Sequence, residues 1–399
     1  GKKKAGRIRR PVLFGEVGRP VVAYEVDGFH PQHEIVLEVE AGRGAANNAD
    51  YRDLIRASLM VDARFLVLAM NSRFDNNEAS VVWEHLALDV KTGVEFLKRQ
   101  GGVRTVVLFG HSGGAATLSF YQAVAEKGTS FCDAPGKLTV CGKELSNLPK
   151  ADGLILVDAS LGNPAGLLRG LNPAVVTEGD PRTIDPALDP FNPANGFNPA
   201  GSTYTAEFKQ KYHEAQSARM NRLIATAAAR ASQLGSDRGP FPDNDLVLIV
   251  RGQGARLMDS ETLADTATSS PRKLLRNNGS TVTQIVKSVR PAVRPNPALN
   301  ATFDGGARLL TLKSFLTANA IRSTNSMTGI DWCSTNSSTP CALGHISVPL
   351  LVSAMGGNTG IRDNEWLYEG AASRDKDFFV LAGATHNMEP CVECEARTG

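Results

Sequence analysis

The stretch Thr105-Val-Val-Leu-Phe-Gly-His-Ser-Gly-Gly-Ala-Ala116 decides the fold expected of this 399-residue chain. Its first five residues are β-branched, aliphatic or aromatic, which is typical of a strand buried on both faces. Glycine and other small residues follow, and residues 117–126 continue with the pattern of a helix. The sequence therefore predicts a strand that turns sharply into a helix at residues 110–114.

This turn holds Ser112 between glycines in the pattern G-x-S-x-G. In a strand–turn–helix of this kind, the glycines leave room where strand and helix approach closely, and the serine hydroxyl is exposed at the strand tip as a nucleophile. The backbone N–H of Gly113 would lie at the start of the helix without an intrahelical partner, so it could donate to an oxyanion. A glycine-rich turn without a chemical role is the alternative interpretation.

Strands alternate with helices around this turn, which favours a mainly parallel sheet. With the turn and with Gly383-Ala-Thr-His386 near the end of the sequence, this order resembles the α/β-hydrolase superfamily. The resemblance implies an α/β-hydrolase fold, with a mainly parallel sheet flanked by helices. It divides the chain into a first part of the core at residues 1–160, a large, mostly helical cap at 161–346 inserted after the strand that ends at Asp158, and a second part of the core at 347–399.

Within the expected cap, residues 206–234 are rich in alanine and predicted to be helical, residues 246–250 form an apolar run, and residues 271–276 have a helix-like pattern. A cap of this length would shape a sizeable, partly apolar pocket, exclude water and select substrates. The terminal helix of the superfamily is expected to be missing, truncated or replaced, because only a short cysteine-containing segment follows His386.

A serine nucleophile needs a base within hydrogen-bond reach and a buried carboxylate that orients the base. His386 follows a predicted strand through Gly-x-x-His, similar to the catalytic-histidine loop of the superfamily, and its late position fits the order serine, acid, histidine. The resemblance therefore implies that His386 is the base. His111, directly before the serine, is expected to point away from it.

The acid is harder to assign, because the place where most of the superfamily carries it falls on Asn358 or Thr359, and neither can be charged. Members that resemble haloalkane dehalogenases or pancreatic lipase take the acid from the tip of the preceding strand, which here presents Asp158. Asp158 is therefore the preferred acid. Glu365 and Asp363 remain alternatives, although Asp363 also suits the N-cap of a helix and Glu365 its first turn.

The second oxyanion donor is expected from the loop at residues 41–48. The superfamily usually has His-Gly here, followed by the residue whose backbone N–H donates, but Ala41 replaces that histidine. By this alignment Gly42 keeps its place and Arg43 is the expected donor, together with Gly113. A glycine-rich loop that only turns the chain is the alternative.

The amino-acid composition argues against some classes of binding partner but does not identify one. A net charge of +2, with 43 basic and 41 acidic residues, gives no electrostatic case for nucleic acid or an acidic membrane. No stretch is expected to span a bilayer or to act as a signal peptide. His30 and His33 lack further metal ligands nearby. The expected partner is a small-molecule ester; no cofactor or metal is implied, and the oligomeric state stays open.

The six cysteines fall into three near-neighbour couples, Cys132 with Cys141, Cys333 with Cys341, and Cys391 with Cys394. The first two couples bracket short polar loops, as loop-closing disulfides do. Disulfides favour a periplasmic or secreted protein, whereas reduced cysteines would fit the cytoplasm.

These residues predict a serine esterase that cleaves carboxylic esters or lactones of a bulky, partly apolar substrate through an acyl-enzyme. An acyltransferase that uses the same acyl-enzyme is one alternative. A catalytically silent binding module is another, since fold alone does not fix function.

Overall fold

The computed structural model describes residues 8–14, 19–26, 28–40, 60, 65–70, 79–234, 243–252, 254–257, 266–290, 297–298, 302–391 and 394. The expected oxyanion loop with Arg43 lies outside these residues, so it stays a prediction.

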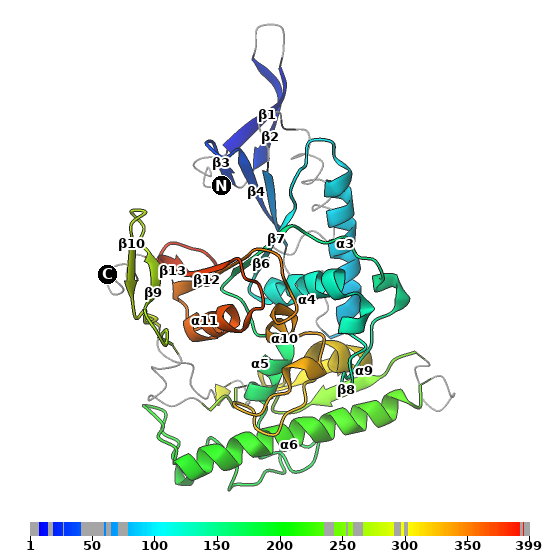
Figure 1. Cartoon of the computed structure of the whole chain (residues 1–399). Helices are drawn as coiled ribbons and strands as arrows, with labels where there is room; N and C mark the ends of the chain where they lie inside the picture. Colours follow the sequence, from blue (N-terminus) through cyan, green and yellow to red (C-terminus); the bar gives the residue numbers. More distant parts are fainter. Residues whose placement is uncertain are drawn as a thin grey trace.

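The main sheet has six strands in the order β10-β9-β13-β12-β7-β6, and its helices lie beside it (Figure 1). The pairs from β6 to β9 are all parallel, and β10 pairs with β9 antiparallel. The strands are β6 (Val107–His111), β7 (Gly153–Val157), β9 (Arg272–Leu275), β10 (Thr281–Gln284), β12 (Leu350–Gly357) and β13 (Lys376–Thr385). The predicted α/β class, with mostly parallel strands flanked by helices, is confirmed.

Helices α3 (Trp83–Arg99), α4 (Gly113–Lys127), α10 (Thr339–Leu343) and α11 (Ile361–Gly370) accompany this sheet. Helix α4 is buried along most of its length because its residues are small or apolar on every face. Its Phe120 and Tyr121 are fully buried in one core with Leu156 and Val352 of the sheet strands. This packing fixes the turn between β6 and α4 against the rest of the sheet.

The N-terminal strands form two smaller sheets. β1 (Ile8–Phe14) and β2 (Pro20–Val26) pair antiparallel. β3 (Gly28–His30) pairs antiparallel with β4 (Ile35–Glu40), which pairs in parallel with β5 (Phe65–Met70). β5 lies against β6, so this sheet adjoins the main one (Figure 1).

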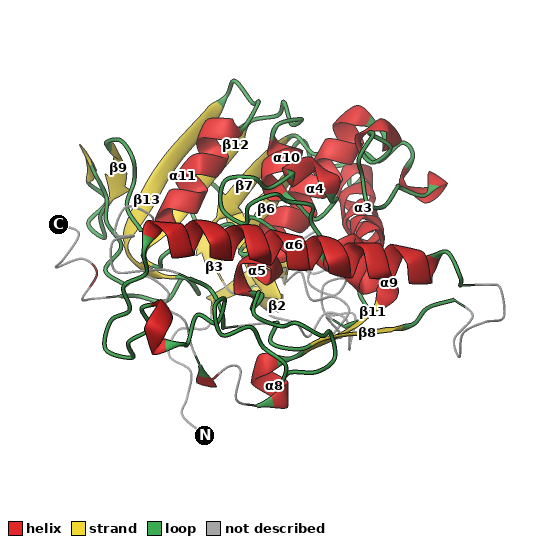
Figure 2. Cartoon of the chain, turned by 90° about the horizontal axis from the view of Figure 1, so that it is seen from below, coloured by secondary structure: helices red, strands yellow, loops and turns green. Residues whose placement is uncertain are grey.

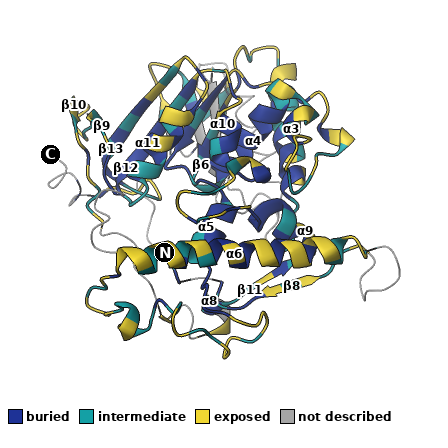
Figure 3. Cartoon of the chain, turned by 60° about the horizontal axis from the view of Figure 1, so that its bottom comes forward, coloured by how far each residue is buried: buried dark blue, intermediate teal, exposed yellow. Residues whose placement is uncertain are grey.

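A second core lies apart from the sheet. It is formed by side chains of α5 (Asn163–Gly170), α6 (Ala206–Ala231), β8 (Leu246–Ile249), β11 (Arg308–Thr311) and η5 (Phe315–Asn319). Figure 2 shows α6 crossing most of the width of the molecule, and Figure 3 shows that one side of it is exposed. The short elements are η1 (Thr129–Phe131), η2 (Lys143–Leu145), η3 (Pro193–Asn195), α8 (Phe303–Gly306), α9 (Leu312–Ser314) and η6 (Trp332–Ser334).

The interval 161–346 is therefore divided between two cores. Its α6 and β8 belong to the second core, whereas β9 and β10 extend the main sheet and α10 packs on α4. The helix-like pattern at residues 271–276 predicted the wrong structure, because Arg272–Leu275 is paired on both sides, with β13 and with β10. Strand pairing on both edges outweighs the local preference of so short a segment.

All three cysteine couples form disulfides, Cys132–Cys141, Cys333–Cys341 and Cys391–Cys394, which confirms the predicted pairing. Three disulfides are compatible with an extracellular protein. Within the described part of the chain, no helix has the length and apolar character needed to cross a bilayer.

Candidate active site

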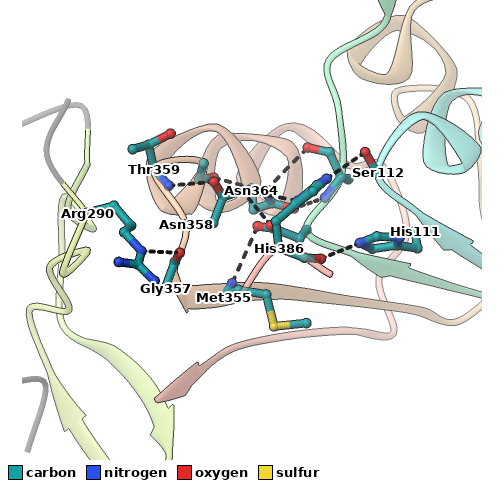
Figure 4. A network of polar contacts seen from close by, with 12 residues as sticks. His111, Ser112, Arg290, Met355, Gly357, Asn358, Thr359, Asn364 and His386 are labelled. Carbon is teal, nitrogen blue, oxygen red and sulfur yellow. Dashed lines mark hydrogen bonds and ion pairs between the residues drawn. The ribbon is translucent and has the colours of Figure 1, made fainter. Parts of the chain in front are cut away.

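Four neighbouring parallel strands of the main sheet are each followed at once by a polar residue. Ser112 follows β6, Asp158 follows β7, Asn358 follows β12 and His386 follows β13. Because the carboxyl ends of parallel strands lie at one edge of a sheet, residues far apart in the sequence meet there. Figure 4 shows this meeting point.

Ser112 is held in a strained turn. Its backbone has φ 54° and ψ −122°, a conformation that side-chain-bearing residues rarely adopt and that is typical of functional sites. A Cβ at Gly110 would lie 2.8 Å from Cα of Ala115, so this position requires glycine. The Ser112 N–H donates to the carbonyl of Val157, and the Ser112 carbonyl accepts from Ser160. The turn is thereby fixed to the end of β7.

His386 connects Ser112 to Asp158. Its Nε2 lies 2.9 Å from Oγ of Ser112 (Figure 4). Its Nδ1 lies 2.6 Å from Oδ2 of Asp158. The imidazole side chain is 40% exposed, while the Asp158 side chain is fully buried. The histidine therefore faces solvent at the site while its inner nitrogen faces a carboxylate that cannot reach water.

Asp158 is oriented by donors from the next strand. The Nδ2 of Asn358 donates to Oδ2 of Asp158 at 2.5 Å and lies 3.2 Å from Nδ1 of His386. The Asn358 Oδ1 accepts from the N–H of Thr359, which orients the amide with its nitrogen toward the carboxylate. The Met355 N–H lies 3.4 Å from Oδ1 of Asp158. Asn358, one of the two residues at which the resemblance would place the acid, thus acts as a donor to Asp158.

The hydrogen bond to Asp158 raises the pKa of His386 above its ordinary value, although partial burial acts in the opposite direction. An imidazole with a carboxylate at Nδ1 and a hydroxyl at Nε2 can take the hydroxyl proton and be stabilised as it becomes charged. The arrangement can therefore generate a serine alkoxide next to the start of α4.

The alternative acids lie elsewhere. Glu365 is fully buried on α11, where it accepts hydrogen bonds from Ser269 and from Arg272 and forms an ion pair with Arg362. Burial alone would raise the pKa of Glu365, but these hydrogen bonds outweigh it and hold the pKa below its ordinary value. Asp363 lies in the first turn of α11, which begins after Gly360, so it is not the N-cap that its position in the sequence suggests.

The remaining predicted site residues have different outcomes. Gly113 is the first residue of α4, where the backbone N–H groups have no partner within the helix. Arg43 lies outside the described residues.

The expectation that His111 points away from the site is wrong, because its Nε2 lies 2.6 Å from the backbone oxygen of His386. Among the described residues, no group of three or more His, Cys, Asp or Glu side chains is arranged to hold a metal ion.

Comparisons with known proteins do not place this chain in a family. No protein-family model matches it, and none of the curated proteins does. Among solved structures, it is similar to the esterase domain of a Rhodothermus marinus protein, with 11% identity over 98% of this chain and 93% of that one and a TM-score of 0.30. A likeness this distant establishes neither a family nor a function.

Proposed function

We propose that this protein is a serine hydrolase that cleaves carboxylic esters through an acyl-enzyme, with Ser112 as nucleophile, His386 as general base and Asp158 as the acid. One observation carries the proposal: the unbroken hydrogen-bonded series from Ser112 Oγ through His386 to Asp158, built on a strained turn at the strand ends. A serine and a histidine that meet by chance have no need of a strained backbone or of a buried carboxylate.

The reaction follows from the positions of these groups. As the Ser112 Oγ bonds to the ester carbon, its proton passes to Nε2 of His386 and the carbonyl electrons move to the oxygen. The backbone N–H of Gly113, with Arg43 as the proposed second donor, stabilises that oxyanion. When the ester C–O bond breaks, His386 returns the proton to the leaving alcohol. Water then attacks the acyl-enzyme carbon and gives a proton to His386. The bond to Ser112 Oγ breaks, Oγ takes this proton back, and the carboxylic acid leaves.

The second core is proposed as the cap that selects the substrate. Helix α5 begins at Asn163, shortly after Asp158, and its Leu167, Leu168 and the following Leu171 are buried in this core. The core is thus connected directly to the edge of the sheet that carries the site. A cover of this size suits a bulky, partly apolar ester or lactone, because it excludes water from the reacting atoms.

The test combines covalent labelling with turnover. The wild-type chain is expected to react with a fluorophosphonate at Ser112, identified by mass spectrometry of the labelled peptide, and to release 4-nitrophenol from an aryl ester with an initial burst. Ser112→Ala should abolish both while the far-UV circular dichroism stays unchanged. Turnover of a series of aryl esters from acetate to octanoate then measures the preference for acyl length.

A folded wild-type chain that neither reacts with the fluorophosphonate nor hydrolyses any ester of the series would overturn the proposal and favour a silent binding module. Product ratios in the presence of an added alcohol distinguish hydrolysis from transfer, because an acyltransferase gives mainly the new ester.

A further inference from the structure

His111 precedes the proposed nucleophile and is the last residue of β6, yet its side chain reaches the loop that carries the proposed base. The His111 Nε2 lies 2.6 Å from the backbone oxygen of His386, and the two imidazole rings lie 4.9 Å apart (Figure 4). The strand that presents Ser112 therefore also contacts the main chain of the residue that must activate Ser112.

The chemistry of this contact fixes the proton on His111. A backbone carbonyl can only accept a hydrogen bond, so Nε2 of His111 must carry the hydrogen and donate it. Burial lowers the pKa of His111, which keeps the ring neutral at neutral pH with its one N–H directed at His386. A neutral donor at this point holds the loop without placing a second positive charge beside the His386 imidazolium that forms during catalysis.

Apart from the pairing of Thr385 with Gly357 of β12, the backbone bonds found for this loop lie within its own segment. The Thr385 N–H donates to the carbonyl of Glu389, the Met388 N–H donates to the carbonyl of Thr385, and Ala384 and Pro390 form an isolated bridge. These bonds close the loop on itself, and residues 387–390 at its tip are exposed. The bond from His111 is different, because it joins the loop to β6 and so relates the position of the His386 backbone to that of Ser112.

We propose that His111 is a positioning residue that fixes the His386 peptide relative to the Ser112 turn, so that Nε2 of His386 stays within hydrogen-bond reach of Oγ. This inference depends on the proposed function for its kinetic consequence, but its geometric content is independent of any substrate. A misplacement of roughly 1 Å between reacting groups can slow an enzyme about 100-fold, so one backbone hydrogen bond can matter here.

Three variants test it. His111→Phe keeps a ring but removes the donor, and kcat for the aryl ester is expected to fall by about tenfold with KM within about twofold. His111→Gln keeps an N–H at a similar reach and should restore most of kcat. The matched control is His345→Phe, which likewise keeps a ring but removes an imidazole whose Nδ1 lies 2.9 Å from the Cys341 carbonyl; kcat should not change.

A proton NMR measurement gives a readout that does not need turnover. The low-field resonance of the His386 Nδ1–H, assigned by its absence from His386→Gln, should broaden or shift in His111→Phe and return in His111→Gln. If wild type and His111→Phe share this resonance and the same kcat, the inference is overturned. If wild type hydrolyses no ester, the proposed function fails, and the resonance alone decides whether His111 positions His386.

Discussion

Two fully buried carboxylates, those of Asp158 and Glu365, were candidates for the acid that orients His386, and their neighbours show which of them can do so. Asp158 faces an imidazole and two neutral N–H donors, whereas Glu365 faces two guanidinium groups, those of Arg272 and Arg362. A carboxylate that neutralises arginines stabilises the fold, and one that faces a histidine controls its tautomer.

Asp158→Asn is therefore expected to lower kcat by about 10³- to 10⁴-fold, because an amide at this place favours the wrong tautomer of His386. Glu365→Gln should leave kcat within about twofold but lower the free energy of unfolding by about 1–3 kcal/mol, because two partly exposed arginines lose their carboxylate. Steady-state kinetics and urea unfolding of the two variants measure both effects. The reverse pattern would make Glu365 the acid.

Asn358 offers a second test of the same acid. Its Nδ2 already lies 3.2 Å from Nδ1 of His386. Adding Asn358→Asp to Asp158→Asn restores a carboxylate beside the imidazole, and kcat is expected to recover by about tenfold relative to the single variant. Asn358→Ala in the same background serves as the control and should not recover. Equal rates in both double variants would mean that a carboxylate at position 358 cannot orient His386.

The raised pKa of His386 predicts the pH dependence. Its base form is neutral, so kcat/KM should fall as the pH drops through a pKa above the ordinary value of 6.5. The contribution of the His386–Asp158 pair to the stability of the fold changes with pH in the opposite direction to kcat/KM. Because the folded-state pKa is raised, the charged pair with Asp158 stabilises the protein fully below pH 6.5 and loses this contribution as the pH rises through the raised pKa. An acidic limb centred below pH 6.5 in a kcat/KM profile would contradict the hydrogen bond to Asp158.

At the level of elements, the turn into α4 and the Gly-x-x-His motif could be predicted because each is local in sequence. The Asn358 contact with Asp158 could not, because it depends on β12 lying beside β7, and the His111 contact depends on the end of β13 lying near the end of β6. The helix-like pattern at residues 271–276 was misleading for a different reason: a four-residue strand is too short for periodicity to separate helix from strand, although its partner β10 is local and only β13 is distant in sequence. A useful signal in the sequence was the polar residue directly after each apolar strand.

The Cys391–Cys394 disulfide adjoins two of the strand ends that form the site. Both cysteines are buried, the Cys391 N–H donates to the carbonyl of Gly383 at 2.7 Å, and a Cβ at Gly357 would lie 2.9 Å from Sγ of Cys394. The disulfide therefore packs between the end of β13, before His386, and the end of β12, before Asn358.

Replacing both cysteines with alanine, Cys391→Ala with Cys394→Ala, should change global stability little, because the closed loop is short. We expect kcat to fall by about fivefold or more, since the strand ends that hold the site lose their packing. The matched control replaces Cys132 and Cys141, which close a loop next to η1, and should leave kcat unchanged. Kinetics together with thermal melts measure the difference. A loss of stability with unchanged kcat would make this disulfide purely structural.

At the level of the whole molecule, the two cores have separate interiors with limited connection. The second core contains a fully buried Arg219, which bonds to Glu178 and to the carbonyls of Asn172 and Val250, all within the same part of the chain. Trp332 packs at the edge of both cores and connects them. If the second core is the cap proposed above, its separate interior would let it open without disturbing the sheet that holds the site, which suits a step in which substrate enters and product leaves.

This arrangement predicts that damage to the second core stays local. Met220 is fully buried on α6, and Met220→Ala should lower the stability of its surroundings by about 2–5 kcal/mol. Hydrogen exchange should then show faster exchange in α6 and β8 but unchanged protection in α4 and β7. Leu156→Ala, which removes a fully buried side chain of β7, is the control and should instead speed exchange in α4 and β7. If Met220→Ala exposed α4 as much as α6, the chain would unfold as one unit, and a cover that opens by itself would have no physical basis.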